Sequence, residues 1–434
     1  MQNYSLLEQF FSAMRSSLDI KFKRRRGTLP PWTTLLLLMQ LTIGNRSVGY
    51  LGTICKMMTT CGALLGWKQD QDPNASSFCR ARTKLSASML QQVLAAALAE
   101  VQPRLDSAMP RVHGRRMLAI DGAKVNIPRT KTLRELFGCP KGGPRGERVH
   151  QPQLLVVLLV DVLTRFVVAY EILPHDGSER AGAHALLRHV LPDDILLFDR
   201  GFHARTLIAD ISSLKNVGYI FRMCAGERGW RELRAAQRQR NPDAGVMIAL
   251  GDELRPARHL SYVHQRGRPR RGTRKETMHL LTNLPRQGFG RKLIRELYRA
   301  RWGIETMIEE FKISLDGENF HARTAAGIRQ EIDVLFLCLS LAALADVAAK
   351  IAAGIDIDSP LDPHRKICNR MALLEILAGV VALGGAPTAC NQGDAAIRSV
   401  GRRAQRRRDG RCFERKCRGR YGRWKQFGGK SRRN

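Results

Sequence analysis

Three acidic residues occupy positions from which a carboxylate could act in chemistry. Asp121 follows the apolar run Met117–Ile120, and Asp199 follows the apolar run Asp194–Phe198. Both runs are typical of short buried strands, and open α/β sheets place ligand and metal sites where such strands end. A glycine lies within two residues of each aspartate, which leaves room for a ligand beside the backbone. The third acid, Glu305, lies in a segment with helical spacing.

The segment Arg291–Leu315 has the periodicity of one long helix and gives Glu305 three polar neighbours. The four polar residues, spaced by three, four and seven positions, are Tyr298, Arg301, Glu305 and Lys312. At about 100° per residue they share a stripe about 60° wide that borders the apolar side of the helix. That border suits a site, because the core fixes the backbone while the side chains reach a cleft. The alternative is an ordinary Arg301–Glu305 surface pair, worth only about 0.2–0.5 kcal/mol.

The chain carries a large excess of positive charge. Its 434 residues include 72 Lys and Arg against 39 Asp and Glu, a formal net charge of +33 at pH 7. Residues 401–434 hold 15 Lys and Arg and two acids, a net of +13, which leaves +20 on the first 400 residues. Such an excess predicts a polyanionic partner, with nucleic acid first and an anionic membrane surface as the alternative. The hydrophobic share of 44% excludes disorder over the whole chain and indicates a real core.

No segment has the pattern of a membrane span or a signal peptide. The apolar runs Leu35–Met39 and Val334–Ala345 are shorter than the roughly 20 residues that a bilayer requires, so we expect both to be buried helices. The ten cysteines are scattered without a disulfide framework, which suits a reducing cytosol. Cys412 and Cys417 lack the nearby second Cys or His pair that a zinc site would need.

The length, about three times that of a typical domain, predicts several domains. Residues 1–110 are expected to form a small helical DNA-binding domain. Its helices are predicted at Ser5–Met14, Thr33–Leu41 and Ser88–Val101. The stretch from Ser76 to Lys84 adds three basic residues, Arg80, Arg82 and Lys84. These could contact DNA, or they could form a solvated basic face of a helix.

Residues 111–350 predict an α/β domain with the element order β-β-β-α-β-α-β between 117 and 223. This order favours a sheet with an antiparallel hairpin beside parallel strands. Residues 225–285, rich in Arg and Gly, predict an insertion of β structure. Residues 351–395 form a C-terminal region, and we expect the basic tail 396–434 to be disordered without a partner.

Three motifs together resemble the DDE transposases of bacterial insertion sequences, in the subgroup named for its Tyr-Arg-Glu-Lys signature. They are Asp121-Gly122, Asp199-Arg200-Gly201-Phe202 and Tyr298-x2-Arg301-x3-Glu305-x6-Lys312. The resemblance runs from about 115 to 350 and includes Pro174–Glu179 and Gly327–Glu331. The stretch Phe78–Leu85 also looks like the N-terminal domain of the family. The resemblance implies an RNase H-like catalytic fold with a β insertion between the second aspartate and the glutamate.

The resemblance also implies a role for each motif residue. Asp121, Asp199 and Glu305 would be the catalytic triad and would hold two Mg²⁺ ions, for which Mn²⁺ could substitute. The residues matching the DNA-contacting positions are Tyr298, Arg301 and Lys312. The implied partner is double-stranded DNA, both element ends and target, bound by a homodimer on paired ends. No membrane is implied, and the expected location is the bacterial cytoplasm at the nucleoid.

We therefore expect a transposase that binds the terminal inverted repeats of its element. It would hydrolyse the end phosphodiesters and transfer the freed 3′-hydroxyl to target DNA. One alternative is an RNase H-like nuclease that cleaves without strand transfer. Another is a DNA-binding protein whose catalytic site has decayed, although the intact triad and signature argue against it.

Overall fold

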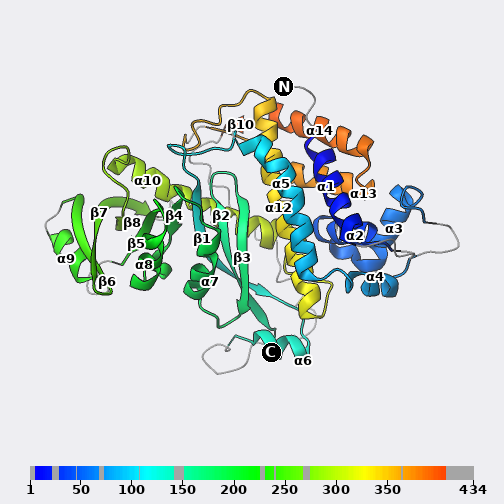
Figure 1. The fold of residues 1–434 in the computed structure, drawn as a ribbon, viewed down its shortest axis with the longest axis horizontal. Helices are drawn as coiled ribbons and strands as arrows, with labels where there is room; N and C mark the ends of the chain where they lie inside the picture. The colour runs from blue at the N-terminus through cyan, green and yellow to red at the C-terminus, as the bar shows by residue number, and fades with distance from the viewer. Residues whose placement is uncertain are drawn as a thin grey trace, which may run out of the picture.

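A computed structural model describes residues 5–21, 29–44, 46–67, 73–106, 108–140, 151–224, 230–238, 241–266, 274–362 and 365–406. A large sheet and a body of helices lie side by side in it (Figure 1). Cys412, Cys417 and most of the predicted basic tail lie outside the described residues.

The sheet has eight strands in the order β3-β2-β1-β4-β5-β8-β7-β6. The first five are β1 (Met117–Asn126), β2 (Gln153–Asp161), β3 (Phe166–Pro174), β4 (Ile195–Phe198) and β5 (Gly218–Met223). Strand β2 is antiparallel to both β1 and β3, while β4 is parallel to β1 and β5 is parallel to β4. The predicted α/β sheet, with a hairpin beside parallel strands, is confirmed.

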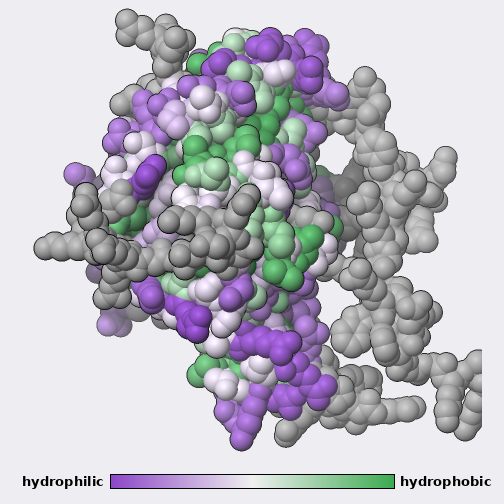
Figure 2. All heavy atoms as spheres, turned by 90° about the vertical axis from the view of Figure 1, so that its right-hand side faces the viewer, coloured by the Kyte–Doolittle hydropathy of each residue, from purple (hydrophilic) through white to green (hydrophobic). Residues whose placement is uncertain are grey.

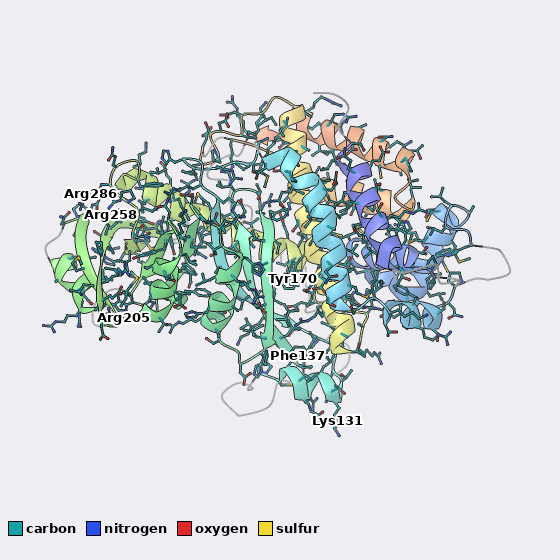
Figure 3. All side chains as sticks on the ribbon, viewed as in Figure 1. Lys131, Phe137, Tyr170, Arg205, Arg258 and Arg286 are labelled. Atoms are coloured by element: carbon teal, nitrogen blue, oxygen red, sulfur yellow. The ribbon has the colours of Figure 1, made fainter. Side chains whose placement is uncertain are left out.

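The predicted β insertion extends the same sheet. Its strands are β6 (Asp243–Leu250), β7 (Glu253–Arg266) and β8 (Arg274–Thr282), and β8 pairs with β5. Arg258 lies on β7, in the insertion part of the sheet (Figure 3). It is buried, pairs with Asp243 at 2.7 Å, and donates to the backbone oxygens of Leu284 and Phe289, which fixes the strands to the following loop. The short polar helix α9 (Arg231–Arg238), which packs on β6, was not expected.

Helices cover both faces of the sheet. Side chains alternate along each strand, so successive residues of β1 belong to different apolar cores. Leu118 and Ile120 join one apolar core with α7 (Glu179–Leu186) and α8 (Arg205–Ser213). Met117 and Ala119 join the other core. That second core contains the segment predicted as one helix over Arg291–Leu315, which is three pieces instead. They are α10 (Arg291–Ala300), α11 (Trp302–Glu309) and a π-helical turn at Glu310–Ser314.

The helices predicted within residues 1–110 share their core with helices from the end of the chain (Figure 1). The first group is α1 (Leu6–Lys21), α2 (Pro31–Ile43), α3 (Gly49–Cys61), α4 (Ala75–Arg82) and α5 (Ala87–Asp106). The second group is α12 (Ala325–Ala352), α13 (Arg370–Ala382) and α14 (Pro387–Arg402). Helix α12 contacts α2, α5, α13 and α14. The DNA-binding role of residues 1–110 stays a prediction, and their helices do not stand apart.

One expectation about the helical body needs correction, and another is confirmed. Helix α14 extends to Arg402, so the start of the segment 396–434 is helical and packed rather than a tail. Helix α12 is one described helix that is long and apolar enough to cross a membrane, yet 94% of its most apolar window is buried inside the protein. It is therefore the core helix that Val334–Ala345 predicted. The outer side of the body shows hydrophobic patches between hydrophilic ones (Figure 2).

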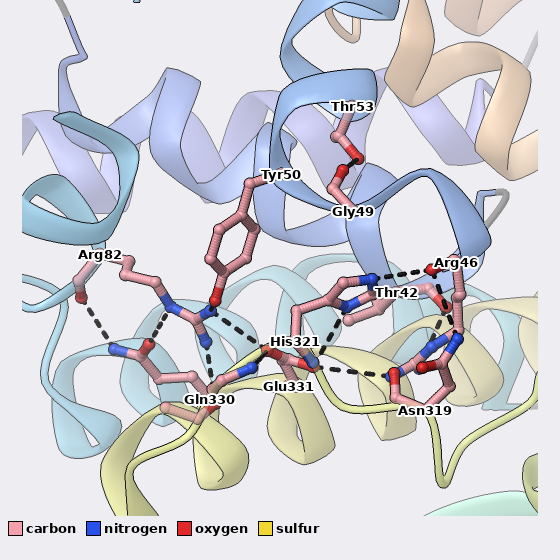
Figure 4. A network of polar contacts seen from close by, with 12 residues as sticks. Thr42, Arg46, Gly49, Tyr50, Thr53, Arg82, Asn319, His321, Gln330 and Glu331 are labelled. Atoms are coloured by element: carbon pink, nitrogen blue, oxygen red, sulfur yellow. Dashed lines mark hydrogen bonds and ion pairs between the residues drawn. The ribbon is translucent and has the colours of Figure 1, made fainter. Parts of the chain in front are cut away.

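A buried polar network ties α4 to the start of α12 (Figure 4). Glu331 is fully buried and pairs with Arg82 at 3.1 Å and with Arg46 at 3.6 Å. Its carboxylate also accepts hydrogen bonds from the backbone nitrogens of His321 and Ala322. Arg82 is thus only 4% exposed, and neither of the roles considered for it from sequence, DNA contact or a solvated face, is available to it.

Candidate active site

Asp121 and Asp199 lie level with each other, the first within β1 and the second directly after the neighbouring parallel strand β4. Ala119 of β1 pairs with Leu197 of β4, and each aspartate is two residues further along the chain. Because side chains alternate, both carboxylates point to the face of the sheet that Ala119 and Leu197 share. The expectation that Asp121 ends its strand is wrong, since β1 continues to Asn126 through its pairing with β2.

The two aspartates are held by backbone N–H groups beside them. The Asp121 carboxylate accepts from the Gly122 nitrogen at 2.9 Å, and the Asp199 carboxylate accepts from the Gly201 nitrogen. Burial raises the pKa of Asp121 to about 6, while the Gly122 hydrogen bond and the charge of Arg301 lower it. The negative charge of Asp199 adds to the rise, as expected for two carboxylates that share one site.

Glu305 lies in the first turn of α11, at a break in the segment predicted as a single helix. The Arg301 nitrogen donates to the Tyr298 oxygen at 3.2 Å, a tighter turn than that of an α-helix. Gly303 comes so close to the β2–β3 loop that a Cβ there would lie 2.5 Å from the Val162 oxygen. The break and this glycine bring α11 down against the sheet, where it contacts β1 and β2.

Arg301 joins two of the three acids. Its guanidinium nitrogens lie 2.5 Å from Glu305 Oε1 and 3.7 Å from Asp121 Oδ2. The side chain is only 9% exposed, and its Nε has no hydrogen-bond partner among the residues that the structure describes. The Arg301–Glu305 pair is therefore not an ordinary surface pair, because Arg301 is buried and also reaches Asp121 on β1, while Glu305 is 34% exposed.

The two other signature residues have different surroundings. Tyr298 is 6% exposed, packs its ring against the Arg301 guanidinium at 5.8 Å, and has its pKa raised to about 12 by burial. Lys312, in the π-helical turn, donates to the backbone oxygen of Lys124 and pairs with Glu318 at 3.6 Å. Lys312 therefore lies beside β1, three residues beyond Asp121.

A large cavity opens beside the signature. Its volume is about 790 Å³, and it lies between the insertion strands and α10. Its charged and aromatic lining includes Arg222, Tyr262, Arg295, Tyr298, Arg299, Arg301 and Trp302. The four arginines and three aromatic rings line the cavity from both sides and form the chemistry that phosphates and bases favour, although Glu276 also lines it and pairs with Arg222 at 2.8 Å.

Sequence reasoning missed Glu179, a fourth acid next to the pair of aspartates. Its carboxylate lies against Gly122, where a Cβ would be 2.4 Å from Glu179 Oε1. Burial raises the pKa of Glu179, and the charge of Asp199 raises it further. The available signal was the position of Glu179 at the end of the motif loop that precedes the first helix of the α/β domain.

The donor set suits a hard divalent cation, although the described part of the chain shows no three Asp, Glu, His or Cys side chains grouped as metal ligands. Carboxylate oxygens are the ligands that Mg²⁺ prefers. Between Asp121 and Glu305 a positive charge is already present, the Arg301 guanidinium. The acids thus supply the oxygen donors that a divalent cation prefers, and the guanidinium of Arg301 lies between two of them, Asp121 and Glu305.

Comparisons with known proteins indicate a family for the chain. A family model described as a transposase DDE domain matches residues 113–341, more than half of the chain, and this range contains the six residues of the predicted site. The chain is 24% identical over 159 residues to "Putative transposase InsZ" of Escherichia coli strain K12, which covers 37% of this chain and 52% of that protein. It thus spans about half the length of that relative. The match confirms the resemblance to DDE transposases of insertion sequences.

A solved structure is also similar over most of the chain. It is the cryo-EM structure of the piggyBac transposase synaptic complex with hairpin DNA. The likeness covers 92% of this chain and 86% of that chain, at 11% identity and a TM-score of 0.44.

Proposed function

Because the chain belongs to the family of transposase DDE domains, we propose that it is the transposase of an insertion sequence. It would bind the terminal inverted repeats of its element, hydrolyse the end phosphodiesters and transfer the freed 3′-hydroxyl to target DNA. The observation that carries the proposal is the level placement of Asp121 and Asp199, with Glu305 joined to Asp121 through Arg301.

An RNase H-like catalytic core is part of the proposal. Its support is the arrangement of β1 to β5, three antiparallel strands followed by two parallel ones, with β1 in the centre. The β insertion lies between Asp199 and Glu305 in the chain and continues the sheet beyond β5. The site therefore lies near the middle of the sheet, with cavities on the insertion side.

Asp121, Asp199 and Glu305 would hold divalent cations, two Mg²⁺ ions with Mn²⁺ as a substitute. When bound, such ions lower the pKa of an attacking oxygen and stabilise the leaving oxygen of a phosphodiester. The protein's own part is to fix the carboxylates, which the Gly122 and Gly201 N–H groups do by donating to the two aspartates. Backbone donors of this kind hold a carboxylate in one orientation before any ligand arrives.

Tyr298, Arg301 and Lys312 would hold the DNA strand beside the acids. An arginine grips a phosphate through two parallel hydrogen bonds, and a lysine acts as a point charge. Arg301 lines the large cavity and can reach a phosphate there. Lys312 would have to exchange its contacts with Lys124 and Glu318 for DNA.

The partner in this proposal is double-stranded DNA, bound by a homodimer on paired ends in the bacterial cytoplasm at the nucleoid. The net charge of +33 and the arginines of the cavity support a DNA partner. The dimer and the location follow from the family alone.

The test is cleavage of a duplex that contains the DNA flanking the coding region, with Mg²⁺ or Mn²⁺. Asp199→Asn should reduce nicking by about a thousandfold, or about 4 kcal/mol of transition-state stabilisation. An asparagine can still accept from the Gly201 nitrogen, so the fold should persist. Asp252→Asn, at an exposed turn between β6 and β7, is the matched control and should cleave normally.

Three other results would revise the proposal. Full cleavage by Asp199→Asn would reject the site. Nicked ends that never join to target DNA would favour the RNase H-like nuclease. Specific DNA binding without cleavage in either metal would favour a decayed transposase.

A further inference from the structure

Arg301 lies between two surroundings that each attract its positive charge. On one side its guanidinium contacts Asp121 and Glu305, at 3.7 and 2.5 Å. On the other side is the cavity of about 790 Å³, whose wall includes Arg301 itself. Within the described part of the chain the buried Nε has no hydrogen-bond partner, so the carboxylates do not use all of the donors of Arg301.

We propose that Arg301 is an internal counter-ion that keeps the carboxylates closed to divalent cations until a DNA phosphate enters the cavity. This inference rests on the proposed function, since it assumes a cation site at Asp121 and Glu305 and DNA in the cavity. It assigns Arg301 a regulatory role in addition to DNA contact, by which DNA binding prepares the site for metal.

The first step is competition for one place. A guanidinium and a divalent cation repel each other, and both cannot lie between the same two carboxylates. In the free protein the guanidinium holds that place, and burial makes its contacts stronger than those of a solvated pair. A cation that is to bind both Asp121 and Glu305 must therefore displace Arg301 first.

The second step is an alternative partner for the displaced arginine. A phosphate offers a guanidinium two parallel hydrogen bonds, and the cavity on that side of Arg301 is large enough for one. Arg295 and Arg299 line the same cavity and would attract the DNA backbone to it, whereas Arg222 there is paired with Glu276 at 2.8 Å. A phosphate that takes Arg301 leaves Asp121 and Glu305 free for a cation.

The consequence is linkage between the two ligands. If DNA raises the affinity for a cation, the cation raises the affinity for DNA by the same factor, typically about 5- to 150-fold. The order of events is also set, because the acids become competent only where DNA is bound. A transposase would thus not bind metal at its carboxylates in the absence of its DNA substrate.

Mn²⁺ binding to the full-length protein, measured by calorimetry, tests the proposal without any cleavage readout. Arg301→Gln should bind Mn²⁺ about tenfold more tightly than the unaltered protein when DNA is absent. Arg291→Gln removes the same charge from the exposed start of α10, and its Mn²⁺ affinity should not change. Adding a short DNA duplex should raise the Mn²⁺ affinity of the unaltered protein at least about fivefold, and should not do so in Arg301→Gln.

Several outcomes would overturn the inference. Equal or weaker Mn²⁺ binding by Arg301→Gln would do so, as would the same duplex effect in both proteins. If Arg301→Gln did not fold, the duplex measurement on the unaltered protein would still decide, since no rise in affinity contradicts the linkage. Failure of the proposed function looks different: Mn²⁺ binding would then be unaffected by Asp121→Asn.

Discussion

The carboxylate of Glu179 occupies the space where a side chain of residue 122 would lie. A Cβ on Gly122 would be 2.4 Å from Glu179 Oε1 and 2.6 Å from its Cδ. A glycine next to Asp121 therefore lets an acid of α7 approach the strand that carries the first aspartate. The contact places Glu179 among the groups that set the charge of the site.

Gly122→Ala should act on cleavage through Glu179. The new methyl group would push the Glu179 carboxylate away, so Gly122→Ala and Glu179→Ala should each lower the cleavage rate, by about tenfold or more. Because both changes remove the same contact, the double variant should be no worse than either single one. Cleavage rates of the four proteins measure this coupling. Gly245→Ala, where a Cβ meets nothing within 4 Å, is the control, and additive losses would contradict the prediction.

Glu331→Gln should destabilise the protein strongly. Glu331 neutralises the buried Arg82 and Arg46, and an amide in its place would leave two guanidinium groups without their charge partner. Breaking a buried ion pair in this way costs about 3–5 kcal/mol of unfolding free energy. Urea unfolding followed by circular dichroism measures the loss. Glu309→Gln, at an exposed position on α11, should change the unfolding free energy by less than about 0.5 kcal/mol.

His259 should make the insertion sensitive to acid. Its ring is fully buried, and its Nε2 lies 3.1 Å from Nδ1 of His279. Burial lowers the pKa of His259 to about 4, and the charge of His279 contributes to the shift. The unfolded chain, with an ordinary pKa of about 6.5, binds a proton at higher pH than the native protein does. The stabilisation is therefore present above about pH 6.5 and is lost as the pH falls toward 4.

His259→Gln removes this titration, so its unfolding free energy should fall less with pH than that of the unaltered protein. The difference between pH 7.5 and pH 4.5 should be about 2 kcal/mol. Urea titrations at both values give the four free energies. His264→Gln, an exposed position on the same strand, should keep the pH dependence of the unaltered protein. A parallel pH profile for His259→Gln would show that the ring does not titrate as expected.

The cavity arginines should contribute to DNA binding as phosphate contacts. Arg295→Gln and Arg299→Gln should each weaken DNA binding for every duplex sequence. Each should also reduce the slope of log affinity against log salt by about 0.9. Fluorescence anisotropy at several salt concentrations gives the slopes. Arg188→Gln, whose exposed side chain pairs with Glu171 outside the cavity, should leave the slope unchanged.

The strands of the sheet could be predicted because burial leaves a local record. Leu154–Val160 is buried throughout, and its unbroken apolar run predicted a strand of the hairpin, which the structure has as β2. The break near Arg301 could not be predicted, because the apolar and polar residues of Arg291–Leu315 recur at the spacing of one continuous helix. It depends on the close approach of Gly303 to the Val162 backbone, more than a hundred residues away.

The order of the residues by itself determined the family of this protein, its six motif residues and the kinds of elements that hold them. These are properties of spacing and local polarity, which can be recognised within a short segment of the chain. The tertiary structure decided that Asp121 lies within its strand and level with Asp199, and that Glu179 faces Gly122. It also decided that Arg301 lies between two acids. These relationships join segments far apart in the chain, so only the packing of strand, helix and turn could set them.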